Sequence, residues 1–165
     1  MLKNTLTIAA LLLATSAHAN QTPIVGNVES KCTIYTDTVG VYGNPAPDEL
    51  STAAVDGGVD PVIRIDAVQG NAYKAMISWP QSFSTSPNLT DALNWTGDVT
   101  VSRVSDPTMS AYETNKIVYD NVVEYDLTVA GNTWFTIESA VEYGVGKSLP
   151  GGKYTAIVTA ECIAK

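Results

Sequence analysis

Two cysteines near opposite ends of the chain restrict the fold more than any other feature of the sequence. Cys32 and Cys162 are the only cysteines among 165 residues. The segment that ends at Cys162 alternates between two faces with a period of two, which predicts a long terminal β-strand. One face of this strand carries Tyr154, Ala156, Val158, Ala160 and Cys162. We therefore expect Cys162 to point into the interior of a β-fold.

The first 19 residues have the pattern of a secretory signal. Lys3 supplies a positive charge, residues 6–14 are apolar, and Ala17-His18-Ala19 fits a cleavage site. The apolar run is too short to cross a bilayer core of about 30 Å. We expect an exported protein without a membrane span, located in the periplasm, at the cell surface or outside the cell. In such an oxidising compartment the two cysteines, which have no other partner, are predicted to form a disulfide.

Length and charge limit the class of protein further. The expected mature chain, residues 20–165, has the length of one domain with a core of its own. The formal charge is −8, and loss of Lys3 with the signal makes it −9. We expect no nucleic-acid partner, because so acidic a domain is repelled by phosphate backbones and by anionic membrane surfaces.

Alternating runs bounded by turn residues predict about seven strands. Turn residues at 69–72 and 131–132 predict two hairpins, and Asp106 followed by Pro107 predicts the start of a short helix. The fold class that follows is all-β, an immunoglobulin-like antiparallel sandwich with adjacent first and last strands. A small closed barrel is the alternative. The predicted strands are residues 28–36, 62–68, 73–79, 98–104, 122–130, 135–141 and 154–162, with an edge segment at 117–119.

Two long segments between the predicted strands are expected to be loops. Residues 44–61 are rich in acids and prolines, and residues 80–97 are polar with one possible helical turn at 91–94. The first loop offers oxygen ligands of the kind that calcium prefers. A solvated loop whose acids only add charge is the competing interpretation. The candidate calcium ligands are Asp48, Glu49, Asp56 and Asp60.

Missing histidine restricts catalysis. The one histidine, His18, lies within the expected signal, so the mature chain has no imidazole base or ligand. A disulfide would also remove both thiolates as nucleophiles. We therefore expect a protein that is not an enzyme and has no cofactor other than possible calcium; a hydrolase based on paired carboxylates is the remaining enzymatic hypothesis.

The three tryptophans suggest one further binding residue. Trp79 and Trp134 fall on predicted strands, where packing in the core is the default expectation. Trp95 lies in the polar segment, where its ring could stack on a sugar or could cover one end of the sandwich. Trp95 is thus the candidate carbohydrate-binding residue.

Two stretches resemble known exported proteins. Val25-Gly-Asn-Val28-Glu-Ser-Lys-Cys32-Thr-Ile34 leads from an apolar arm into a cysteine strand, and Gly152-Lys-Tyr154-Thr-Ala-Ile-Val158 opens the last strand. Both resemble subunits of chaperone–usher pili and the related spore-coat-U-like secreted domains. The resemblance implies a structural protein of the cell surface. In that family the first cysteine pairs with a nearer one, whereas the pairing with Cys162 would hold the two terminal strands together and close the fold.

These observations lead to two hypotheses of function. The first is a non-enzymatic structural or adhesive surface protein, such as a subunit of a fimbria or biofilm matrix, that associates with itself or with other surface proteins. The second is a soluble periplasmic or secreted module that binds calcium or carbohydrate. Assembly of the purified protein into oligomers would favour the first hypothesis over the second.

Overall fold

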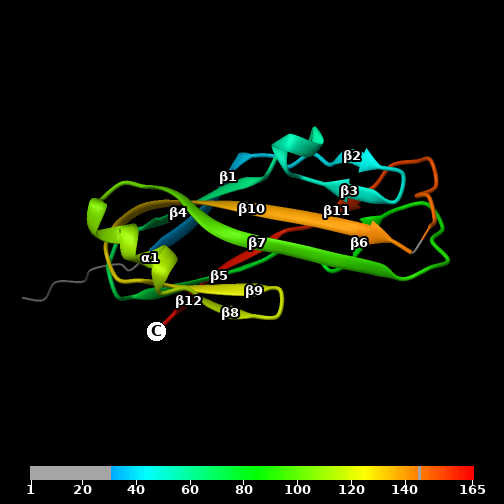
Figure 1. The fold of residues 1–165 in the computed structure, drawn as a ribbon. Coiled ribbons are helices and arrows are strands. Elements are labelled where there is room, and N and C mark those ends of the chain that lie inside the picture. Colours follow the sequence, from blue (N-terminus) through cyan, green and yellow to red (C-terminus); the bar gives the residue numbers. More distant parts are fainter. Residues whose placement is uncertain (1–30, 145) are drawn as a thin grey trace, which may run out of the picture.

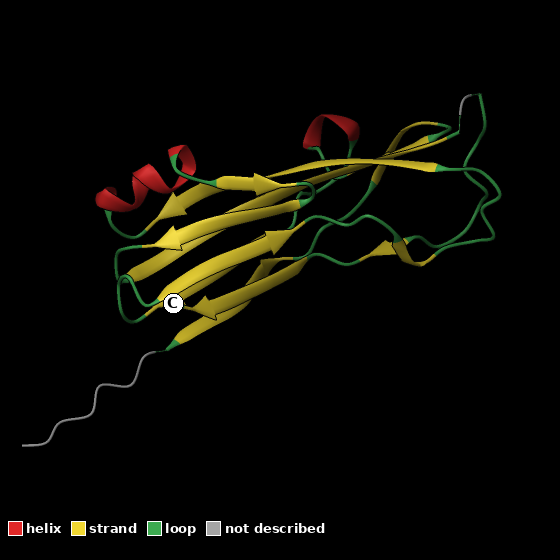
Figure 2. Ribbon diagram, turned by 90° about the horizontal axis from the view of Figure 1, so that it is seen from below, coloured by secondary structure: helices red, strands yellow, loops and turns green. Residues whose placement is uncertain are grey.

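Two layers of antiparallel β-sheet form the body of the molecule, as Figures 1 and 2 show. The computed structural model describes residues 31–144 and 146–165. The expected signal, the arm at 20–26 and the beginning of the predicted first strand lie outside the described residues.

The strands and helices have the following bounds. The strands are β1 (Cys32–Thr38), β2 (Gly43–Ala46), β3 (Glu49–Ser51), β4 (Val62–Ala67), β5 (Tyr73–Ser78), β6 (Phe83–Thr85), β7 (Leu93–Val104), β8 (Ile117–Tyr119), β9 (Val122–Leu127), β10 (Gly131–Tyr143), β11 (Thr155–Ala156) and β12 (Thr159–Ala164). The helical segments are η1 (Ala54–Asp56), η2 (Pro107–Ser110) and α1 (Ala111–Thr114).

One layer, which we call the large sheet, is organised around β10. This strand of 13 residues pairs with β7 along one side, and with β4 and then β3 along the other. β1 continues the sheet beyond β4, and β2 continues it beyond β3. The other layer, the small sheet, has the order β12-β5-β9-β8. A separate pair of short strands, β6 and β11, lies beyond it.

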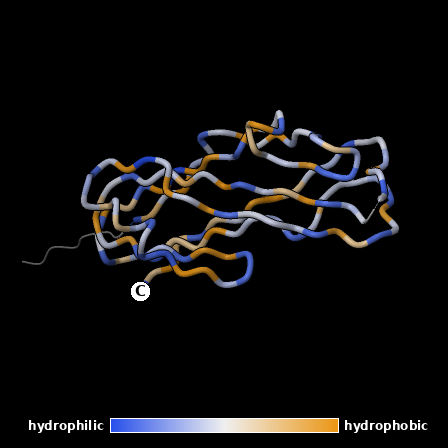
Figure 3. The backbone as a smooth tube through the Cα atoms, viewed as in Figure 1, coloured by the Kyte–Doolittle hydropathy of each residue, from blue (hydrophilic) through white to orange (hydrophobic). Residues whose placement is uncertain are grey.

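The core lies between the two sheets and follows the alternation along the strands. Every second residue of β9 and β10 is buried, whereas the residues between them are more exposed. The colours in Figure 3 show the same mixture of hydrophobic and hydrophilic residues along the strands. At the centre, the rings of Tyr125 and Phe135 lie 4.7 Å apart and join the small sheet to the large one. The all-β sandwich is confirmed, and the described strands do not close into the alternative barrel.

Both predicted hairpins are wrong, although the strands themselves are present. β4 belongs to the large sheet and β5 to the small sheet, so the turn at 69–72 crosses between layers. The same is true of β9 and β10, since Gly131 already belongs to β10 and pairs with β4. The two crossings lie side by side, because the Asn71 amide donates to the Leu127 carbonyl at 2.8 Å.

Several strands occur where loops were predicted. The segment 44–61 contains most of β2, all of β3 and η1, and β3 pairs with β10. Pro45 is tolerated because β2 is the outermost strand of the sheet. β7 begins at Leu93, so the helical turn predicted at 91–94 does not form. The last predicted strand is divided, since β11 pairs with β6 and β12 pairs with β5.

The predicted helix start at Asp106 is confirmed. Its side chain accepts a hydrogen bond from the Thr108 amide at 2.8 Å, and Pro107 occupies the first position of η2. Hydrogen bonds from the Thr108 hydroxyl and amide lower the pKa of Asp106. The helical region continues through α1 to Thr114. Within residues 31–144 and 146–165, no helix has the length and apolar character needed to cross a membrane.

The predicted disulfide between Cys32 and Cys162 is present. The two Cα atoms lie 6.2 Å apart, and both cysteines are partly buried against the core. β1 and β12 are not hydrogen-bonded neighbours, however, because each is the edge strand of a different sheet. The bond therefore joins the two layers at one edge of the sandwich.

One buried tyrosine gives the fold a pH dependence. The Tyr125 hydroxyl donates to the Val99 carbonyl at 2.6 Å, and burial, with smaller contributions from Glu113 and Asp98, raises its pKa well above the usual range. The unfolded tyrosine titrates near pH 10, so this group stabilises the fold below about pH 10 and its contribution is lost as the pH rises further.

We expect Tyr125→Phe to weaken this alkaline loss of stability. At neutral pH the change should cost about 1 kcal/mol, because Lys116 Nζ still donates to the Val99 carbonyl at 2.8 Å. Urea unfolding between neutral pH and pH 11 measures both effects. Tyr119→Phe is the matched control, since Tyr119 is exposed. An unchanged alkaline slope in Tyr125→Phe would contradict the assignment.

Candidate functional site

A groove of about 760 Å³ lies along the edge that holds the disulfide. One wall is β1 from Ile34 onward together with residues 38–42, and the other is the chain from 152 to 160. Leu50 and Ile63, which are both buried, form part of its floor. The groove therefore opens directly onto the interior of the sandwich.

The groove exists because, among the described strands, neither sheet continues beyond this edge. β1 pairs only with β4, and β12 pairs only with β5. The final chain joins the small sheet only from Thr159 onward, because the β11 portion before it pairs with β6. The disulfide joins the walls near one end, where the first and last strands are adjacent as expected. The two strands do not pair by hydrogen bonds, so the groove stays open between them.

The lining of the groove is uncharged and more apolar than polar. Val39 is 75% exposed and Ile157 is 63% exposed, which leaves large hydrophobic side chains in contact with solvent. None of the described residues that line the groove is charged. Apolar side chains beside the free edges of two sheets suit an extended polypeptide, which can add a strand and bury alternate side chains.

Polar groups at the floor of the groove satisfy one another. The Thr52 hydroxyl donates to Asp60 Oδ1 at 2.6 Å and accepts from the Ser139 amide at 2.9 Å. The hydroxyls of Ser139 and Tyr42 lie 3.1 Å apart. Burial raises the pKa of Tyr42, and the bond to Ser139 opposes that effect. These groups are therefore already engaged within the fold.

The predicted calcium ligands do not come together as a site. Glu49 lies in β3, Asp56 ends η1, and Asp60 is bound to the Thr52 hydroxyl. Asp48 lies between β2 and β3, where its carbonyl accepts from the Tyr143 amide at 2.8 Å. In the part of the chain that the structure describes, no three His, Cys, Asp or Glu residues gather in a group that could hold a metal. The folding of this acidic segment into strands separates its carboxylates.

Trp95 belongs to an aromatic cluster near one end of the groove. Phe83 lies at the centre of this cluster, with its ring 4.8 Å from Trp95 and 5.0 Å from Tyr154. The Trp95 side chain is half-buried, and its Nε1 is buried without a partner among the described residues. This packing suits the covering role that the sequence left as an alternative. Sugar binding by Trp95 stays a prediction.

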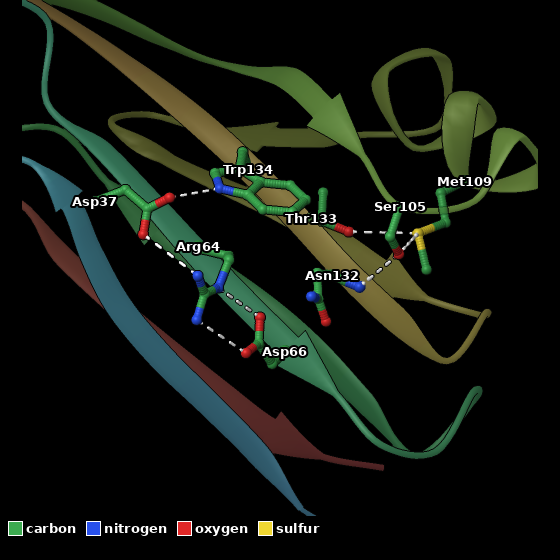
Figure 4. Close-up of polar contacts among 8 residues, drawn as sticks. All are labelled: Asp37, Arg64, Asp66, Ser105, Met109, Asn132, Thr133 and Trp134. Carbon is green, nitrogen blue, oxygen red and sulfur yellow. Dashed lines mark hydrogen bonds and ion pairs between the residues drawn. The ribbon is translucent and has the colours of Figure 1, made fainter.

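Trp134 does not lie in the core, contrary to expectation. It projects from the outer face of β10, because its neighbours Thr133 and Phe135 point inward. Figure 4 shows its Nε1 donating to Asp37, which also pairs with Arg64. The Arg103 guanidinium stacks over the Trp134 ring at 3.7 Å. These contacts link β1, β4, β10 and β7 across the large sheet.

The sequence partly anticipated the groove. Tyr154, Ala156 and Val158 were assigned to the inward face of the last strand, and all three line the groove. The alternation cannot show that a neighbouring strand is missing. Val39 and Val41, which continue the alternation beyond the predicted first strand, also line the groove.

Comparison with known protein families, with curated proteins and with solved structures finds no match to this chain.

Proposed function

We propose that the protein is an exported, non-enzymatic structural or adhesive protein of the cell surface that assembles from copies of itself. The observation that carries this proposal is the open apolar groove between the edge strands β1 and β12. Exposed apolar surface of this kind marks sites of protein interaction. The resemblance of residues 25–34 and 152–158 to pilus subunits supports the same class of function.

The proposed occupant of the groove is the arm of a second copy, residues 20–30. This segment contains Ile24, Val25 and Val28 and only one charged residue, Glu29. Its composition therefore matches a lining without charges. Eleven residues are enough for a strand of about five or six residues with a linker before Cys32. Main-chain hydrogen bonds to a free sheet edge would supply affinity, and alternate side chains would fill the groove.

Variants of the groove and of the arm test this proposal separately. Ile34→Arg places a charge on the groove wall, and Ile24→Asp combined with Val28→Asp places charges in the arm. Each is expected to abolish arm-dependent assembly, because burying an unpaired charge is costly. When the two variants are mixed, they should form pairs through this contact. The arm variant keeps an intact groove, and the groove variant keeps an intact arm. Analytical ultracentrifugation measures these states.

Val55→Arg is the matched control, because Val55 is 94% exposed on η1 and does not line the groove. It should assemble as the unmodified protein does. A strictly monomeric unmodified protein, at high salt and with its arm intact, would contradict the proposal. Sequencing of the purified N-terminus tests export, with Asn20 as the expected first residue.

A further inference from the structure

Two tryptophan side chains bury an indole N–H that has no partner. Trp79 is 8% exposed and Trp95 is half-buried. In both side chains Nε1 is shielded from solvent and has no hydrogen-bond acceptor among the described residues. Buried polar groups in native proteins are nearly always satisfied, so two unsatisfied donors call for an explanation.

Trp79 borders the end of the groove that lies away from the disulfide. It precedes Pro80, which lines the groove, and its ring packs on Gly97 of β7. Gly97 pairs with Ser139 of β10, and Ser139 also lines the groove. The disulfide is level with the other end of β10, because Cys32 pairs with the residue of β4 that pairs with the first residue of β10.

Trp95 borders the same end, which we call the aromatic end of the groove. Trp95 lies two residues from Gly97 on the same face of β7. The Phe83 ring contacts Trp95 and lies 5.0 Å from Tyr154 and 6.4 Å from Tyr42, both of which line the groove. The strands β6 and β11, which hold this cluster, lie away from the C-terminal end of β12 (Figure 1). Both unsatisfied donors are therefore found at one end of the groove.

The opposite end of the groove, beside the disulfide, is aliphatic. Ile34 follows Cys32 in β1, and Ala160 precedes Cys162 in β12. Ile34, Ala160 and the neighbouring Val158 all line the groove. The groove thus has two parts of different chemistry, an aliphatic part and an aromatic end that offers hydrogen-bond donors.

The arm has a matching division along one face. Alternate residues of an extended strand share a face, so Asn20 and Thr22 share one with Ile24 and Val28. Ile24 and Val28 suit the aliphatic part of the groove. Asn20 and Thr22 precede them and carry side-chain oxygens that accept hydrogen bonds. The order of side chains in the arm therefore matches the order of surfaces in the groove.

We propose that the aromatic end is a subsite for the first residues of the arm, where Asn20 and Thr22 of a second copy accept hydrogen bonds from Nε1 of Trp79 and Trp95. This inference rests on the proposed function, because its occupant is the same arm. The arm then runs from the aromatic end toward the disulfide, whereas β1 starts at Cys32 and runs away from it. Arm and β1 are thus antiparallel, the arrangement with the more stable pairing per residue.

The NMR signals of the indole N–H groups test the subsite directly. The receptor is the purified, naturally processed arm variant, whose own arm cannot enter a groove, and the probe is a synthetic peptide of residues 20–30. The peptide should shift the Nε1–H signals of Trp79 and Trp95. The signal of Trp134 is the internal control and should stay in place, because this N–H already donates to Asp37.

Changes in the peptide test which of its residues enter the subsite. Asn20→Leu with Thr22→Val removes both acceptors at similar size and should weaken binding at least about tenfold, because the indole N–H groups stay unpaired. Gln21→Leu with Asn27→Leu is the matched control on the opposite face of the strand, and should change the affinity less than about twofold. In a Trp95→Phe receptor the loss of the acceptors should matter less. Isothermal titration calorimetry measures these affinities.

The Ile34→Arg change separates failure of the subsite from failure of the proposed function. Binding that Ile34→Arg abolishes, with both indole signals shifted and a large loss from the acceptor changes, supports the subsite. Binding that Ile34→Arg abolishes, but that leaves the Trp79 and Trp95 signals in place or tolerates loss of the acceptors, would overturn the subsite alone. A peptide that does not bind at all would contradict the proposed function, and the subsite with it.

Discussion

Removal of the disulfide by the paired change Cys32→Ser and Cys162→Ser is expected to lower the free energy of unfolding by about 5 kcal/mol. The bond closes a loop with a sequence separation of 130 residues, and the entropy that it removes from the unfolded chain grows with that length. The figure is an upper value, because a compact unfolded state reduces it. The loss is comparable to the whole stability of many domains.

Urea unfolding of the oxidised protein, the reduced protein and the paired serine variant measures this effect. The reduced protein and the variant should unfold at the same urea concentration, well below that of the oxidised protein. A matching midpoint for all three would show that the bond does not stabilise the fold. The bond also joins the walls of the groove, so the variant should lose assembly through the groove as well as stability.

The sequence predicted the positions of the strands better than it predicted which strands pair with each other. Alternation depends on local burial, and it located all seven principal strands, including β10 with Phe135 and Ile137 facing inward. The alternation of inward and outward residues looks the same in either layer of a sandwich, so it does not show to which sheet a strand belongs. The turns at 69–72 and 131–132 were therefore read as hairpins, whereas the first lies between the two layers and the second begins β10. Only contacts distant in sequence decide that choice.

Strands that break local rules could not be predicted. β2 contains Pro45, and β7 contains Gly97, residues that weaken a strand prediction. At position 97 glycine is needed, because a Cβ atom would lie 2.5 Å from the Trp79 ring. Tertiary packing, which the local pattern does not contain, thus explains the early beginning of β7.

The candidate site was predicted in its parts and not as a whole. The disulfide and the adjacency of the first and last strands were correct, but these two strands do not pair along their length. A disulfide fixes one point between two strands, and it does not require hydrogen bonding along their length. The groove is the consequence, since β1 and β12 belong to different sheets and the final chain joins the small sheet only from Thr159 onward.

The change Phe135→Ala is expected to cost about 3–5 kcal/mol, the usual penalty for emptying a large aromatic site in a core. Phe135 has no exposed surface, and its ring lies 4.7 Å from Tyr125 across the two sheets. The neighbouring Thr136→Ala is the matched control on the same strand. It should cost under about 0.5 kcal/mol, because Thr136 faces outward and is only partly buried. Equal urea midpoints for the two variants would contradict this account of the core.

The losses from Phe135→Ala and from removal of the disulfide have different origins and should add. The aromatic ring stabilises the folded state through contact, whereas the disulfide acts mainly on the unfolded chain. Together they amount to about 8–10 kcal/mol, within the range of about 5–15 kcal/mol that is the total stability of a typical domain. The combined variant is therefore expected to be unfolded or marginally stable at 25 °C, as near- and far-ultraviolet circular dichroism would show. A combined variant with native spectra would mean that a larger share of the stability lies in the β-ladders than this core suggests.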